Sequence, residues 1–76
     1  MSQHIKNATS LNTTDLPNNH TTLKLYLNVN EEFVFSGVIP ENYIIYVPND
    51  MVEKFLYEWI VSKEQLIAYD FLNNEE

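Results

Sequence analysis

The chain has 76 residues, no cysteine and a formal net charge of −7, from eleven acidic side chains against four lysines. This length allows one small domain, which must be stabilised by apolar packing because neither a disulfide nor a zinc–thiolate site is available. Nucleic acids and anionic membranes are bound chiefly through Arg and Lys, so both are disfavoured as direct partners. Any partner attracted at long range is expected to be basic.

Residues 1–21 are rich in Asn, Thr and Ser and show neither helical nor strand periodicity. Such polar side chains compete for backbone hydrogen bonds, and residues 16–19 have the composition of a turn. We therefore expect residues 1–21 to form a disordered tail and residues 22–76 to form a single small α+β domain.

The first regular element is expected at Thr22–Val29, where leucine or valine alternates with other, mostly polar residues. A period of two is typical of a strand with one buried face. A polar turn at 28–32 follows, and residues 33–39 read as the returning strand of a hairpin. Gly37 falls inside this second run and is expected to mark a bulge.

Residues 43–47 form a third β-rich run after a turn at 40–42. Both faces of this run are apolar, so it is either covered on both sides or presents Tyr43 or Tyr46 to a partner. Together the three runs predict a three-stranded antiparallel meander.

A C-terminal amphipathic helix is expected next, with Asp50 as its N-cap and Glu53 three residues later, close to a capping box. The apolar residues that follow have the i, i+3, i+4, i+7, i+8 spacing of one helix face. They are Val52, Phe55, Leu56, Trp59 and Ile60. The expected fold class is therefore α+β.

Residues 62–72 have two interpretations. The chain has no Gly or Pro here, which favours a second helix, and Ser62 with Gln65 can cap it in a new direction. A straight continuation of the first helix would bury Asp70 in its apolar stripe, which is costly. The alternative is a last strand, in which the apolar residues at 67, 69 and 71 alternate with their neighbours. Helix is favoured by a narrow margin.

We find no sequence signature of a catalytic, cofactor or metal site. Both histidines, His4 and His20, lie in the expected tail, away from any Ser and carboxylate of the folded part. A single glycine cannot build a phosphate-binding loop, and no Asp-rich calcium loop is present. Solvated acids on a helix face are far commoner than catalytic carboxylate pairs. We therefore expect a protein that is not an enzyme and holds no cofactor or metal.

The acidity is concentrated in residues 41–76, which carry eight acids and two lysines. A charge of this size also keeps a small apolar domain in solution, and for charge alone this explanation is the stronger. Tyr57 and Val61 are expected one helical turn apart and off the apolar stripe, where they can anchor a partner. The predicted partner-binding residues are Glu41, Asp50, Glu53, Tyr57, Glu58, Val61 and Glu64.

The predicted function is that of a small acidic binding protein of the cytoplasm, an inhibitor or regulator of phage or mobile-element type. It docks on a basic surface of a larger protein, such as a surface that normally binds nucleic acid. The alternative is a structural or assembly subunit that works by homotypic contacts, for example as a homodimer. Neither interpretation makes nucleic acid or a membrane a direct partner.

Overall fold

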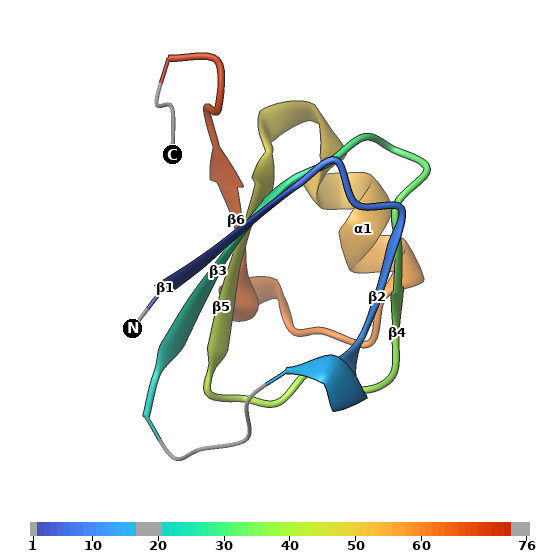
Figure 1. The fold of residues 1–76 in the computed structure, drawn as a ribbon, viewed down its shortest axis with the longest axis vertical. Coiled ribbons are helices and arrows are strands. Elements are labelled where there is room, and N and C mark those ends of the chain that lie inside the picture. Colours follow the sequence, from blue (N-terminus) through green and yellow to red (C-terminus); the bar gives the residue numbers. More distant parts are fainter. Residues whose placement is uncertain (1, 17–20, 74–76) are drawn as a thin grey trace.

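The computed structural model describes residues 2–16 and 21–73. They form two sheets, each built of parallel strands, with a helix at one side (Figure 1). The larger sheet contains, in spatial order, β1 (Ser2–Lys6), β3 (Leu23–Asn28), β5 (Tyr43–Pro48) and β6 (Leu66–Tyr69). The smaller sheet pairs β2 (Ser10–Asn12) with β4 (Val34–Ser36). Helix α1 spans Val52–Glu58. Three short 3-10 turns are η1 (Thr13–Asp15), η2 (Asn49–Met51) and η3 (Lys63–Gln65).

The chain winds as a coil, because each strand of the larger sheet adds beside its predecessor in the same direction. Ser2 lies opposite Lys24 in the first pair of strands. Leu23 lies opposite Tyr43 in the second pair, and β6 continues the sheet beside β5. One turn of the coil therefore takes roughly 20–22 residues, a length found in solenoid proteins. Between strands of the larger sheet the chain passes through the smaller sheet or α1.

The core fills the space between the two layers. Leu25, Leu27, Ile45 and Val47 project into it from the larger sheet, and all are almost fully buried. From the opposite side come aromatic rings, which pack edge to face or, in one pair, stacked at 4.3 Å between centroids. These rings belong to Phe33, Phe35, Phe55 and Trp59.

The strand predicted at 22–29 is confirmed as β3, and its buried and exposed side chains alternate as predicted. Leu23, Leu25 and Leu27 are buried, whereas Lys24 and Asn28 are exposed. The run at 43–47 is confirmed as β5.

The predicted antiparallel meander is wrong. β3 pairs with β1 and β5, in parallel, whereas β4 pairs with β2 in the other sheet. The period-two alternation identifies which side chains are buried but not which strand lies alongside. Phe33 and Phe35 reach the same core from the opposite layer. A hairpin and a coil therefore bury the same residues, and the burial pattern does not distinguish between them.

The prediction of a disordered N-terminal tail is wrong for residues 2–16, which form β1, β2 and η1; residues 17–20 of that tail lie outside the described residues. β1 is polar in composition but obtains its backbone hydrogen bonds from β3. Ile5, Ala8 and Leu11 pack against the core, and Leu16 is part of it. These few apolar side chains are spaced so that each faces inward once the chain is coiled.

The helix is shorter than predicted and lies in mid-chain. Asp50 belongs to η2, and the N-cap of α1 is Met51, without a side-chain capping bond. At its other end the backbone becomes extended at Trp59, with φ −97° and ψ 157°. The predicted stripe consequently stops at Trp59, and Ile60 turns outward to form a parallel bridge with Val38.

The second helix favoured for 62–72 is also wrong, and the alternative strand is the observed structure. The capping pair Ser62 and Gln65 begins only the single turn η3. β6 follows immediately and pairs with β5, so that Ile67 lies opposite Tyr46. Pairing with the edge of β5 satisfies the backbone of β6. This pairing outweighs the local preference of residues 62–72 for helix.

Gly37 lies just beyond β4, not within a strand, and has a φ of +95°. A Cβ at this position would also collide with the Thr13 hydroxyl. We predict that Gly37→Ala lowers the free energy of unfolding by about 1–3 kcal/mol, because both the backbone and the contact become strained. Urea denaturation measures the loss, with Ser36→Ala as the neighbouring control. Equal unfolding midpoints for Gly37→Ala and the wild type would contradict the prediction.

Burial raises the pKa of the Tyr43 hydroxyl above its ordinary value. The folded protein therefore holds this proton more tightly than the unfolded chain, a contribution present below about pH 10 and lost as the pH rises further. We predict that the free energy of unfolding, measured with urea, falls less between about pH 8 and about pH 11 for Tyr43→Phe than for the wild type. Tyr57→Phe, at a side chain that is 91% exposed, is the matched control, and its free energy of unfolding should fall by as much as that of the wild type.

Candidate functional site

Two apolar side chains lie next to one another on the outer surface, just beyond the end of β4. Val38 and Ile60 form a parallel bridge in which the Ile39 N–H donates to the Ile60 carbonyl at 3.2 Å. Val38 is 64% exposed and Ile60 is 62% exposed, whereas Ile39 points inward and is buried. The bridge thus presents an apolar pair to solvent.

A groove of about 640 Å³ is lined by this pair together with Glu41 and Glu64. Both glutamates are exposed, and the half-buried Val61 continues the groove towards the core. Three of the partner-binding residues predicted from the sequence, Glu41, Val61 and Glu64, are therefore brought together here. The groove combines an exposed apolar pair with two carboxylates.

The side chain of Gln65, which is 9% exposed, ties the two segments of this groove together. Its amide nitrogen donates to the Pro40 carbonyl at 2.7 Å and to the Tyr43 carbonyl at 2.9 Å. Its amide oxygen accepts from the Ser62 N–H at 3.2 Å and from the Ser62 hydroxyl at 3.1 Å.

These hydrogen bonds hold the two backbone segments from which Glu41 and Glu64 project. Glu41 follows Pro40 directly in the sequence, and Glu64 directly precedes Gln65. Because a single buried amide holds both stretches of backbone, the spacing of the two glutamates depends on it. Gln65 is therefore a positioning residue of the groove.

The remaining predicted residues lie elsewhere. Glu53, Tyr57 and Glu58 project from α1, and the Glu58 carboxylate accepts from the Lys54 ammonium at 2.6 Å. α1 ends at Glu58, so Val61 does not lie one helical turn from Tyr57 as predicted. The sequence-predicted surface is thus divided between the helix and the groove.

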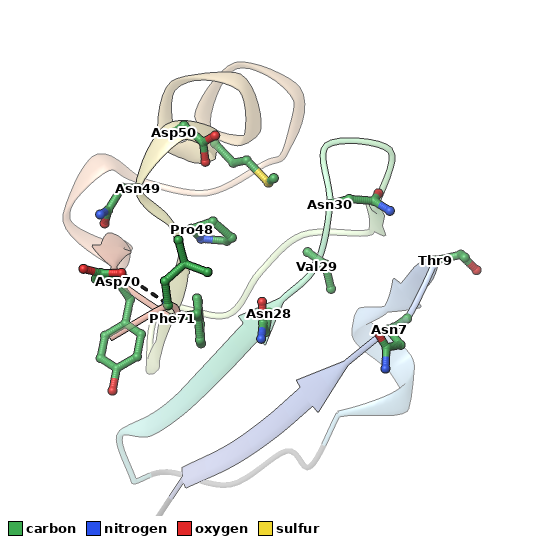
Figure 2. A pocket seen from close by; sticks show the side chains of 14 residues that line it. Asn7, Thr9, Asn28, Val29, Asn30, Pro48, Asn49, Asp50, Asp70 and Phe71 are labelled. Carbon is green, nitrogen blue, oxygen red and sulfur yellow. Dashed lines mark hydrogen bonds between the residues drawn. The ribbon is translucent and has the colours of Figure 1, made fainter. Parts of the chain in front are cut away.

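Asp50 lines a different hollow, of about 680 Å³, at the carboxyl ends of the parallel strands (Figure 2). Figure 2 shows the carboxylates of Asp50 and Asp70 pointing in different directions from separate segments. The Asp70 carboxylate accepts from the backbone N–H groups of Leu72 and Asn73, at 3.2 and 3.3 Å. The two acids therefore do not form the close pair that carboxylate chemistry requires.

Sequence reasoning missed the two exposed apolar residues of the groove, Val38 and Ile60. The alternation of Phe33, Phe35 and Ile39 implies that Val38 faces outward, so a signal for this residue existed. No comparable signal exists for Ile60, because its exposure depends on where α1 ends.

Within residues 2–16 and 21–73, no three His, Asp or Glu side chains are arranged to hold a metal ion. The helices in these ranges fall well short of the length and apolarity that crossing a bilayer requires. The chain matches no family model, no curated protein and no solved structure. A functional proposal must therefore be based on the surfaces of the molecule.

We predict that Gln65→Leu lowers the free energy of unfolding by about 2–4 kcal/mol, because it removes the hydrogen bonds of this buried amide to the Pro40 and Tyr43 carbonyls and from the Ser62 N–H. Urea denaturation measures this effect. Gln3→Leu, at an exposed glutamine, is the matched control and should change stability by no more than about 0.5 kcal/mol. A Gln65→Leu protein as stable as this control would show that the amide does not hold the two segments.

Proposed function

We propose that this protein is a small, non-enzymatic binding protein, an inhibitor or regulator, that docks through the groove at Val38 and Ile60 on a basic surface of a larger protein. The observation that supports the proposal is the placement of Glu41 and Glu64 beside these two exposed apolar side chains. A surface that normally binds nucleic acid has the required basic character.

The chemistry of the groove determines what it can accept. Val38 and Ile60 provide apolar area that is released from water when a partner's side chain covers it. Glu41 and Glu64 favour Lys or Arg next to that side chain, and opposite charge raises the rate of association. The fitting partner therefore presents an apolar residue flanked by basic ones.

The charge of the neighbouring surface works in the same direction. Glu53 projects from α1, and the whole chain carries −7. A basic partner is consequently attracted from a distance and then selected at short range by the apolar pair.

We predict that Glu41→Lys combined with Glu64→Lys weakens binding of a short peptide of alternating lysine and leucine by about tenfold or more, since attraction becomes repulsion at two positions. NMR titration of the labelled protein measures the affinity, and the shifts should centre on Val38 and Ile60. Glu31→Lys combined with Glu32→Lys makes the same change of net charge on the turn before β4, outside the groove, and should cost much less.

The same variants identify a natural partner. The proposal requires a basic protein that is captured by the wild type and by the Glu31/Glu32 variant but not by the Glu41/Glu64 variant. Equal loss in both variants would mean that only net charge matters, and the groove would then have no specific role.

A second candidate function, assembly through homotypic contacts, is favoured by a different observation. β1 and β6 lie at the two edges of the larger sheet and each pairs with one strand only among the described residues. Strand edges of this kind can pair with another chain. A strictly monomeric mass in light scattering at high concentration would exclude this candidate.

A further inference from the structure

The outer face of the larger sheet is chemically unlike the rest of the molecule. Its strands contain no carboxylate, and two of the four lysines of the chain, Lys6 and Lys24, point outward from it. Helix α1 and the smaller sheet cover the opposite face (Figure 1). Among residues 2–16 and 21–73, no helix or second sheet covers the outer face of this four-stranded parallel sheet, whereas such sheets are usually covered on both faces.

A row of aromatic rings crosses this open face. His4 lies opposite Tyr26, and Tyr26 lies opposite Tyr46. The ring centroids are 4.6 Å apart in the first pair and 4.5 Å apart in the second, with interplanar angles of 13° and 9°. These distances match the spacing of about 4.8 Å between strands, so the rings stand upright on the sheet as one stack. Tyr69 packs edge-on against both tyrosines.

The stack determines what the face can bind. Tyr26 has a ring against each of its faces, so it offers no open face to a nucleobase. Binding of single-stranded nucleic acid depends on such open faces, and the central ring of this row does not provide one. The upright rings instead direct their outer edges to solvent, where the hydroxyl groups of Tyr26 and Tyr46 can donate hydrogen bonds to carboxylates.

The two lysines lie on opposite sides of the aromatic row. Lys24 is opposite Ser2 and Lys6 is opposite Asn28, with the pair of His4 and Tyr26 between them. Among the described residues no carboxylate forms an ion pair with either lysine, in contrast to Lys54, which is paired with Glu58. Positive charge and ring edges thus face solvent together, next to the apolar side chains of Ile44 and Ile67.

We propose that this open face, defined by Lys6, Lys24 and the aromatic row, binds an extended acidic peptide segment of a partner protein. Carboxylates of the segment lie at the two lysines and along the ring edges, and its apolar side chains cover Ile44 and Ile67. This surface is separate from the groove and selects the opposite charge. If the groove binds a basic partner as proposed above, this face gives the protein a second docking surface, of opposite preference.

The probe for the test is a short fluorescein-labelled peptide of alternating glutamate and leucine, added to the full chain. Fluorescence anisotropy gives the affinity, and NMR shifts locate the site, which should lie on β1, β3 and β5. Lys6→Glu combined with Lys24→Glu should weaken binding by about tenfold or more, because two attractions become repulsions. Lys54→Glu combined with Lys63→Glu makes the same change of net charge away from this face and should have a much smaller effect.

Three results would overturn the proposal. The two double variants could lose affinity equally, which would leave only a net-charge effect. A single-stranded oligodeoxythymidine that binds the face more tightly than the peptide would assign it to nucleic acid. Shifts of the same residues on raising the concentration of the protein alone would assign it to a second copy. None of these outcomes bears on the groove, which is tested with the basic peptide.

Discussion

The side chain of Gln65 joins two neighbouring turns of the coil at the corner where each returns to the larger sheet. Its hydrogen bonds reach Pro40 and Tyr43 in the preceding turn and Ser62 in its own. The corner before that has a weaker version of the same link, in which the Asn42 amide donates to the Thr21 carbonyl at 2.9 Å. Corners lack the regular pairing of strands, so side-chain amides satisfy their backbone groups. The alignment of β5 with β6, and of the two groove segments, depends on this link.

The buried and exposed sides of two segments, 23–28 and 33–39, were predictable from the sequence, whereas the arrangement of the strands was not. The alternation in β3 and the inward side of Phe33, Phe35 and Ile39 were predictable because burial depends on side-chain period alone. Whether strands are parallel or antiparallel depends on pairing between residues about 20 positions apart, and no local sequence pattern indicates which residues will pair. β1 shows the limit most clearly, since its partner β3 stabilises a polar segment that has no strand signal of its own.

The candidate surfaces follow the same division. Glu41, Val61 and Glu64 were predictable from residue type, although the reason given for Val61 was a helical turn that does not exist. Ile60 was assigned to the buried stripe because the end of α1 at Glu58 has no Gly or Pro to announce it. The aromatic row on the larger sheet was beyond reach, since His4 and Tyr26 become neighbours only when the coil closes.

The winding of the chain also determines how such a protein can change in length. Each strand of the larger sheet pairs only with the strands beside it, so adding or removing a whole turn preserves the direction and register of the remaining strand pairs. An insertion of one residue within β3 would instead exchange its inner and outer faces, placing Tyr26 in the core and a leucine outside. The corners tolerate such an insertion, because they have no alternation to preserve. A whole turn of roughly 20–22 residues therefore preserves the inner and outer faces of the strands, whereas a single residue added within a strand exchanges them.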